Sequence, residues 1–171
     1  MSKQNLTKKR VSLLYLESMY NIINMINLTR TKATANDFNL LYEINELAIK
    51  EHVVKVFGPW DPDDQLKNFK ETTVCEDHEI IYLNDCPIGF INIERKESSI
   101  HLNRICIVPE YQSKGIGTEL LKELLVESKE NYPVTLQVFH SNPARNLYKR
   151  LGFKEYKKSE IHLYLKYEPT F

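Results

Sequence analysis

Hydrophobic and polar residues follow two different periods along the chain, and each period predicts one kind of element. Met25–Lys32 alternates apolar and polar residues one by one, which is typical of a half-buried strand. From Thr34 to about Val54 the apolar residues recur every three or four positions, which predicts a helix with one buried face. The same two periods predict further strands at 79–84, 87–95, 101–108, 134–139, 154–157 and 161–166, and helices at 61–72, 115–129 and 143–151.

The order of these elements, β-α-α-β-β-β-α-β-α-β-β, predicts an α+β fold with a mostly antiparallel sheet flanked by helices. The chain has 171 residues, which suits one domain, and we assign it to residues 25–171. Residues 1–24 form an N-terminal extension of uncertain structure: a loosely attached helix, or a segment upstream of Met25. Basic residues followed by an apolar run at 8–16 are similar to a signal peptide, but Glu17 interrupts the run and no cleavage site follows.

Charge and cysteine content argue against several classes of protein. Lys and Arg together number 23, as do Asp and Glu, so the formal net charge is zero and no nucleic-acid partner is expected. No apolar run is long enough to cross a membrane. The three cysteines, Cys75, Cys86 and Cys106, include no Cys-x-x-Cys pair, which predicts reduced thiols in the core, no metal site and a cytoplasmic location.

One segment points to a ligand. Gln112-Ser-Lys-Gly115-Ile-Gly117-Thr118 follows a predicted strand and precedes a predicted helix. Such a loop presents backbone N–H groups at the positive end of a helix dipole, which is a site for an anion. It lacks the Lys-Ser/Thr of a Walker loop, and Leu120 stands where a dinucleotide-binding fingerprint has its third glycine.

Together with a second segment, this loop resembles the acyl-CoA site of the GNAT superfamily of N-acetyltransferases. The second segment, Asn142-Pro-Ala-Arg-Asn-Leu-Tyr148-Lys-Arg-Leu-Gly152-Phe153, is similar to the family's Tyr-x-x-x-Gly-Phe signature. The spacing from Asn142 to Ala144 is one residue shorter than in many members. The resemblance covers about residues 26–167. It implies a twisted sheet with a splayed central strand pair, acetyl-CoA as co-substrate, and direct attack of a primary amine of a small molecule or peptide on the thioester.

The resemblance also implies roles for individual residues. Asn142 would bind the amide arm of the cofactor, and Tyr148 would protonate the departing thiolate, although Tyr148 also continues an apolar helix stripe and could be a core residue. Arg145 belongs to the basic segment 143–158, which would attract an anionic cofactor. The residues expected to contact the pantetheine arm are Cys106, Ile107 and Val108, and those expected around the pyrophosphate are Gln112, Ser113, Lys114, Gly115, Ile116, Gly117 and Thr118.

The general base and the acceptor are less sharply defined. His101 stands eleven positions before Gln112, where many relatives carry Glu. Glu94 on the adjacent predicted strand and a water chain are the alternatives. Trp60 and Asp61 resemble part of a Gly-Trp-Asp-x-x-Gln pattern and are expected to bind substrate, although Trp60 could simply be a packing residue. The acidic excess of residues 61–80 suggests a cationic acceptor.

Two other classes of protein remain open at this point. A non-catalytic CoA-binding regulator could have the same fold, and the basic residues within 1–10 could bind RNA or a membrane. The sequence permits a monomer or a homodimer, and it does not identify the amine.

Overall fold

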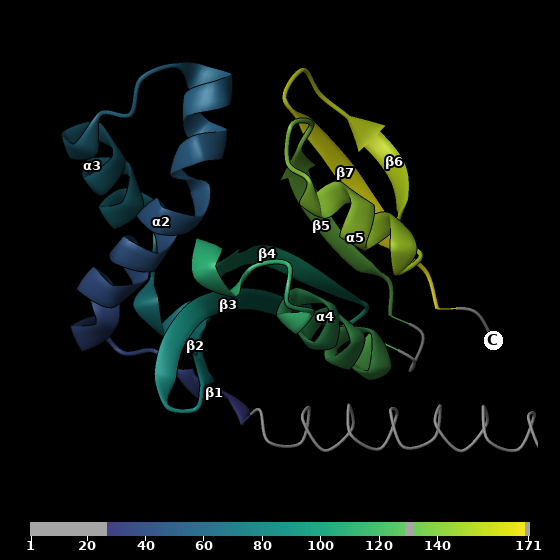
Figure 1. Cartoon of the computed structure of the whole chain (residues 1–171). Helices are drawn as coiled ribbons and strands as arrows, with labels where there is room; N and C mark the ends of the chain where they lie inside the picture. The colour runs from purple at the N-terminus through teal and green to yellow at the C-terminus, as the bar shows by residue number, and fades with distance from the viewer. Residues whose placement is uncertain (1–26, 129–131, 170–171) are drawn as a thin grey trace, which may run out of the picture.

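A computed structural model describes residues 27–128 and 132–169, so the predicted extension at 1–24 lies outside the described residues. Seven strands form one sheet in the order β1-β2-β3-β4-β5-β7-β6 (Figure 1). Their bounds are β1 Leu28–Lys32, β2 His78–Leu83, β3 Cys86–Lys96, β4 Ser99–Ile107, β5 Val134–Phe139, β6 Lys154–Lys158 and β7 His162–Tyr167. All seven strands match predicted segments within a few residues, and the α+β fold is confirmed.

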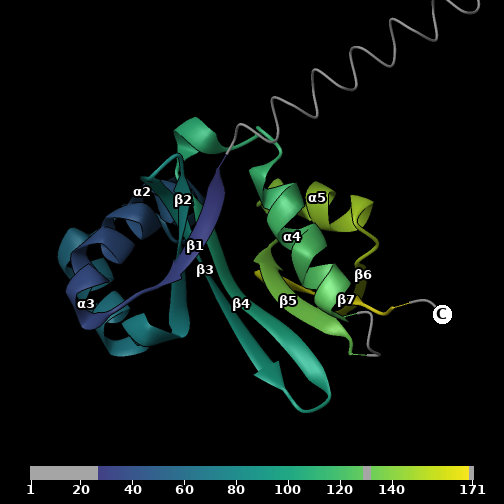
Figure 2. The same cartoon turned by 90° about the horizontal axis from the view of Figure 1, so that it is seen from below.

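Helices cover both faces of the sheet. Figure 2 shows α2 and α3 on one side of the central strands and α4 and α5 on the other. Their bounds are α2 Phe38–Phe57, α3 Pro62–Thr72, α4 Ile116–Glu127 and α5 Ala144–Arg150, and single 3-10 turns lie at Ala35–Asp37, Cys75–Asp77 and Pro109–Tyr111. No helix in the described residues is both long and apolar enough to span a bilayer.

Local sequence signals explain where the first two helices begin and end. Asp37 accepts hydrogen bonds from the backbone and hydroxyl of Thr34, at 2.7 and 2.8 Å, and so fixes the turn that leads into α2. Gly58, with φ of 93°, ends α2 three residues beyond the predicted end. Asp61 caps α3 by accepting from the backbone N–H groups of Asp63 and Asp64, at 3.0 and 3.1 Å.

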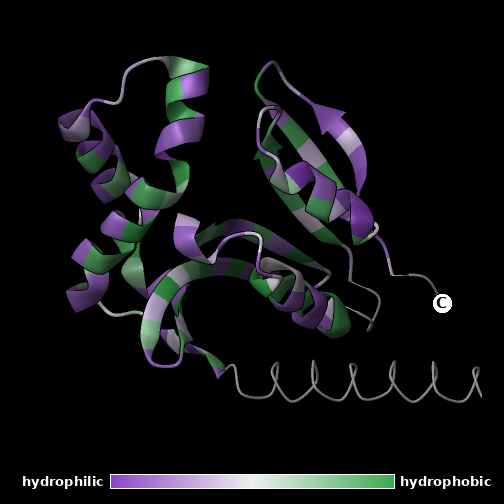
Figure 3. Ribbon diagram, viewed as in Figure 1, coloured by the Kyte–Doolittle hydropathy of each residue, from purple (hydrophilic) through white to green (hydrophobic). Residues whose placement is uncertain are grey.

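The sheet forms the floor of the core. Apolar side chains from the central strands and the inward faces of α2 and α4 are buried together, whereas β6 is exposed along its whole length and is hydrophilic (Figure 3). Cys75 and Cys106 are buried and Cys86 is exposed, so the prediction of core thiols is confirmed for two cysteines and wrong for Cys86. Cys86 follows the tight turn at Asn84–Asp85, where it has no covering layer.

The sheet contains one parallel pair, and this pair opens. β4 and β5 pair at only three positions, Ile100 with Val134, His101 with Thr135 and Leu102 with Leu136. Beyond Leu136, β5 continues to pair with β7, while β4 continues to pair with β3. The two halves of the sheet therefore diverge, as the predicted splayed pair requires, and the diverging ends face α2, α4 and α5 (Figure 1).

Candidate active site

Two cavities meet where β4 and β5 separate. The first, of about 570 Å³, lies among the end of β4, the loop at 108–115, the start of α4 and the start of α5. The second, of about 380 Å³, lies among α2, α3, β4, β5 and β7. Six residues line both cavities: Ile49, His52, Ile105, Cys106, Asn142 and Tyr148. A molecule in one cavity can therefore reach a molecule in the other.

The loop before α4 has the features of an anion site. Ser113 and Gly115 have positive φ angles of 58° and 88°, so the chain turns sharply before the helix. Among the described residues, the backbone N–H groups from Ser113 to Gly115 have no acceptor, and Ile116 and Gly117 begin the helix, where N–H groups have no partner within it. These groups lie at the positive end of α4 and can bind a pyrophosphate.

Not every predicted residue of this loop reaches the cavity. Gln112, Ser113, Gly115, Gly117 and Thr118 line it, as do Cys106 and Ile107 of β4. Three others are outside the lining: the Lys114 ammonium lies 5.2 Å from the centre of the Tyr111 ring, and Ile116 and Val108 are buried in the core. A binding role for these three residues stays a prediction.

The free edge of β4 has backbone N–H groups that can face a ligand. The N–H of Val108 donates to the carbonyl of Ile88, at 2.9 Å, on the β3 side. Because successive N–H groups of a strand point to opposite sides, the N–H of Ile107 points toward the opening. The backbone N–H of Ile107 is therefore available to a ligand, and that of Val108 is not.

Tyr148 lies at the junction of the cavities. Its side chain is 6% exposed, and its hydroxyl makes no hydrogen bond to the described residues. Burial, with a smaller contribution from Cys106, raises the pKa of Tyr148 to about 12, so the phenol stays protonated at neutral pH. It can donate this proton to a thiolate bound at the junction. Because Tyr148 lines both cavities, its hydroxyl can lack a hydrogen-bond partner in the protein although the residue is buried.

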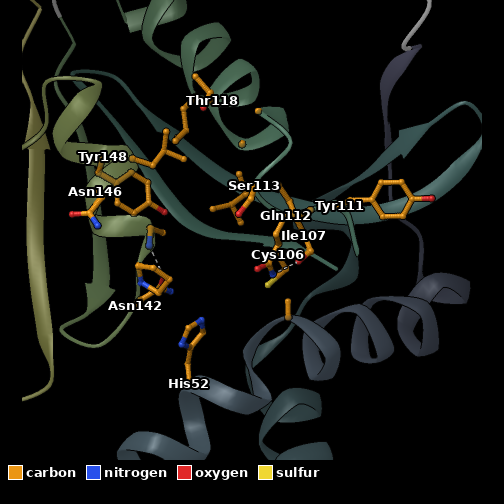
Figure 4. A pocket seen from close by; sticks show the side chains of 18 of the residues that line it. His52, Cys106, Ile107, Tyr111, Gln112, Ser113, Thr118, Asn142, Asn146 and Tyr148 are labelled. Carbon is orange, nitrogen blue, oxygen red and sulfur yellow. Dashed lines mark hydrogen bonds between the residues drawn. The ribbon is translucent and has the colours of Figure 1, made fainter. Parts of the chain in front are cut away.

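The rest of the second segment is divided between cavity and surface. The Asn142 Oδ1 accepts from the N–H of Ala144, at 2.8 Å, which holds its side chain at the cavity (Figure 4), and its amide NH₂ has no acceptor in the part of the chain that the structure describes. Arg145 is exposed and lines neither cavity, whereas Asn146 and Arg150, one helical turn apart, line the first. Arg145 as a cofactor-binding residue therefore stays a prediction, and Arg150 is the α5 cation that lines the cavity.

Cys106 lies beside Tyr148 but is a poor nucleophile. It is 2% exposed, and burial raises the pKa of its thiol to about 12. A thiol with this pKa is almost entirely protonated at neutral pH, so an acyl-cysteine intermediate is disfavoured. This arrangement favours direct attack of the acceptor on the thioester.

His101 and Glu94 lie away from both cavities. They face each other across β3 and β4 at the closed end of the strand pair. The Nδ1 of His101 is 2.7 Å from the Thr135 hydroxyl, and burial lowers its pKa. The carboxylate of Glu94 is 3.2 Å from the ammonium of Lys96. The structure therefore does not bring either residue to Tyr148, and a catalytic role for them stays a prediction.

His52 of α2 is at the junction instead. Its side chain points into the space between Asn142 and Cys106 (Figure 4), and its Nδ1 is buried with no partner among the described residues. The sequence carries a signal for this placement, since position 52 continues the helical spacing of Leu41, Asn45 and Ala48, three residues of the inward side of α2.

Trp60 and Asp61 line neither cavity. Lys50 lies over the Trp60 ring at 5.5 Å, and Asp61 caps α3. The α3 residues in the second cavity are Gln65 and Asn68, and its lining contains no Asp or Glu. The acidic run at 61–80 therefore does not make the second cavity acidic.

Comparison with known proteins agrees with this geometry. A model of the acetyltransferase (GNAT) domain matches residues 61–163. A [ribosomal protein bS18]-alanine N-acetyltransferase of Haemophilus influenzae is 34% identical over 127 residues, which is 71% of this chain and 77% of the relative. The chain belongs to the GNAT superfamily. An N-alpha-acetyltransferase of Sulfurisphaera tokodaii is also 34% identical, over 136 residues, 73% of this chain and 79% of the relative.

Solved structures share the GNAT fold. The PaiA N-acetyltransferase of Thermoplasma acidophilum, in complex with coenzyme A, has a TM-score of 0.68 at 19% identity and covers 83% of this chain and 99% of its own. The ribosomal-protein-S18-alanine N-acetyltransferase of Escherichia coli has a TM-score of 0.60 at 21% identity, covering 84% and 95%. Family membership makes this chain an N-acetyltransferase that uses acetyl-CoA and an amine, as the two sequence segments predict.

Proposed function

We propose that this GNAT enzyme acetylates the α-amino group at the N-terminus of a peptide or protein. The observation that carries the proposal is the acceptor cavity, the second of the two, whose lining has no carboxylate. Both relatives named above modify such an amine by their printed names, one an alanine and the other an N-alpha position.

The pKa of the protonated amine explains why the charge of the cavity lining is informative. An α-amino group has a pKa of about 7.8, so about one molecule in seven is neutral at pH 7, and reaching that state costs about 1 kcal/mol. A lysine side chain or polyamine with a pKa near 10.4 is neutral only about 0.04% of the time, a cost of about 4.6 kcal/mol. The lining has no carboxylate that could attract a cationic amine or take its proton. The cavity therefore suits the less basic α-amino group.

The donor occupies the first cavity in this proposal. The N–H groups from Ser113 to Gly117 hold the pyrophosphate, and the amide of Asn142 binds the pantetheine arm. The free N–H of Ile107 then faces the thioester carbonyl and stabilises the negative charge that develops on its oxygen. These contacts place the thioester at the junction between the cavities.

Proton transfer involves two side chains of the junction. The amine attacks the thioester carbon, a C–N bond forms, and the C–S bond breaks. His52, with an unpartnered ring nitrogen, takes the proton that the amine loses, directly or through water. Tyr148 gives its proton to the thiolate of coenzyme A. His52 replaces His101 and Glu94 as our choice of base because it lines both cavities.

A thiol-release assay with matched peptides tests the acceptor. One peptide has a free N-terminus and no lysine, and the other has the same length, a formylated N-terminus and one lysine. We expect acetylation of the first at least tenfold faster, with mass spectrometry locating the acetyl group on the α-nitrogen. Acetylation of the lysine alone would overturn the acceptor class. Coenzyme A binding without turnover of either peptide, or of any other amine, would instead favour the CoA-binding regulator.

Three further predictions accompany the proposal without support from the cavities. The enzyme acts in the cytoplasm, it has no nucleic-acid or membrane partner, and it is a monomer or a homodimer. Size-exclusion chromatography with light scattering distinguishes the last two states.

A further inference from the structure

The acceptor cavity contains one permanently charged side chain, Arg104 of β4. Its Nη1 donates one long hydrogen bond of 3.4 Å to the Oδ1 of Asn45, and its guanidinium lies 5.8 Å from the centre of the Phe69 ring. In the part of the chain that the structure describes, no carboxylate lies within 4 Å of this guanidinium. Arg30 and Arg95, by contrast, each pair with glutamate.

This arrangement leaves most of the binding capacity of Arg104 unused. A guanidinium has five N–H donors in a planar fork, and one of them is occupied within the described residues. The residue is partly buried between β4, α2 and α3, where a charge is less well hydrated than at the surface. A carboxylate that enters the cavity can accept two parallel hydrogen bonds from this fork.

The position of Arg104 relative to the junction indicates which residue of the acceptor carries that carboxylate. Arg104 is two residues before Cys106, which lines the junction where the amine reacts, and two residues of a strand span roughly 6.7 Å. In an extended peptide, the side-chain carboxylate of the second residue lies roughly 6–8 Å from the α-amino nitrogen, because consecutive Cα atoms are 3.8 Å apart. Both separations are short, so the guanidinium is within reach of a side chain near the acceptor N-terminus, and the second residue is the first one beyond the residue that reacts.

We infer that Arg104 binds an acidic side chain at the second position of the acceptor peptide, and so selects N-termini that carry Asp or Glu there. This inference rests on the proposed function, because it needs a peptide α-amine at the junction. The neutral lining supports it, since no carboxylate of the cavity competes for the guanidinium. The neighbouring Asn68 and Asn103 also line the cavity and add neutral amides rather than charges.

Two peptides test the inference, and they differ only in a carboxylate or a carboxamide at the second residue. Ala-Glu and Ala-Gln peptides of otherwise identical sequence are acetylated by the wild-type enzyme at saturating acetyl-CoA. We expect kcat/KM to be about tenfold higher for the Glu peptide, mainly through a lower KM, since only the Glu carboxylate can accept charge-assisted hydrogen bonds from the guanidinium. Equal values of kcat/KM for the two peptides would overturn the inference while leaving the proposed function intact.

Substitutions then assign the preference to Arg104. Arg104→Gln should bring the Glu/Gln ratio close to one. Arg104→Lys, which keeps the charge without the fork, should keep a ratio of about threefold. Arg95→Gln removes an arginine outside both cavities and should leave the ratio unchanged. A tenfold ratio that survives in a folded Arg104→Gln protein would overturn the assignment.

Two further outcomes are distinguishable. If lysine side chains are acetylated and neither N-terminus is, the proposed function fails and this inference fails with it. If free glutamate is acetylated faster than the Ala-Glu peptide, the carboxylate bound by Arg104 is that of a single amino acid, and the peptide assignment is wrong. Circular dichroism of each variant shows whether it is folded before its rates are compared.

Discussion

The carboxamide of Gln112 donates a hydrogen bond of 2.7 Å to the backbone carbonyl of Ile107. This bond joins the anion-binding loop to the free edge of β4. Since the N–H and C=O of one strand residue point to the same side, Gln112 occupies the carbonyl of Ile107 and leaves its N–H for a ligand. The glutamine therefore sets the geometry between the pyrophosphate site and the thioester site.

Removal of this bond should weaken cofactor binding. For Gln112→Ala we expect the KM for acetyl-CoA to rise about five- to tenfold, because one hydrogen bond contributes about 1 kcal/mol and the loop loses its anchor. Calorimetry with coenzyme A and steady-state kinetics measure the effect. A change confined to the KM of the acceptor would contradict the role given to Gln112.

Tyr148→Phe should slow the chemical step and leave cofactor affinity within about twofold. Loss of a general acid lowers kcat by about 10²-fold, whereas the ring keeps its packing, including the edge contact with Phe153 at 5.7 Å. Tyr167→Phe is the matched control, since Tyr167 also packs on Phe153 and lines neither cavity. Equal losses of kcat and coenzyme A affinity in Tyr148→Phe would indicate a structural role only.

His52→Gln should lower kcat/KM at every pH at which the acceptor amine is neutral. The histidine ring takes the proton that the amine loses, and a glutamine carboxamide has no basic nitrogen that could take it. We expect kcat/KM to fall about 10²-fold at pH 8. His140→Gln serves as control, because His140 contacts the carbonyl of Ser159 outside both cavities. An unchanged kcat/KM in a folded His52→Gln protein would show that another group takes the proton.

The sequence predicts the elements of this fold well and its site unevenly. Strand and helix periods, capping residues such as Asp61 and turn residues such as Asn84–Asp85 act locally, and the structure follows them. The loop at 112–118 and Tyr148 also lie in short segments of fixed spacing, so the sequence predicts them as well. These features do not depend on how distant elements meet.

The acceptor side could not be predicted in the same way. His101 has the expected spacing from Gln112, but β4 and β5 are still paired at His101, and the cavities begin beyond that point. Spacing along one strand does not show where two strands separate. His52 and Arg104 come from α2 and β4, 52 positions apart, and their shared cavity arises only from tertiary packing.

Gly89 of β3 is predicted to be essential for the stability of the sheet. A methyl group at this position would overlap the carbonyl oxygen of Cys106, which is backbone and cannot rotate away. We expect Gly89→Ala to lower the free energy of unfolding by about 2–4 kcal/mol. Gly117→Ala is the comparison, because its methyl would make ordinary contacts at 3.5 and 3.7 Å with Leu147 and Ile107. Equal urea midpoints for Gly89→Ala and wild type would contradict the close approach of β3 and β4.

Cys106 should make the enzyme sensitive to alkali. Its pKa is raised by burial from about 9 in the unfolded chain to about 12 in the folded protein, so above pH 9 the unfolded chain releases a proton that the folded protein keeps. The contribution of this neutral thiol to stability is complete below pH 9 and is lost as pH rises toward 12, at up to about 1.4 kcal/mol per pH unit. Tyr148 adds a loss of the same sign above pH 10.

Urea unfolding between pH 7 and pH 10 avoids most of the Tyr148 contribution, and Cys75, whose pKa is also raised by burial, is unchanged in the variants compared. The free energy of unfolding of wild type should fall from pH 9 to pH 10, and Cys106→Ala should flatten that fall even though the variant is about 1 kcal/mol less stable at pH 7. Cys86→Ala, which removes an exposed thiol, is the control for loss of a cysteine. Parallel pH curves for wild type and Cys106→Ala would mean that the thiol of Cys106 ionises as easily in the folded protein as in the unfolded chain.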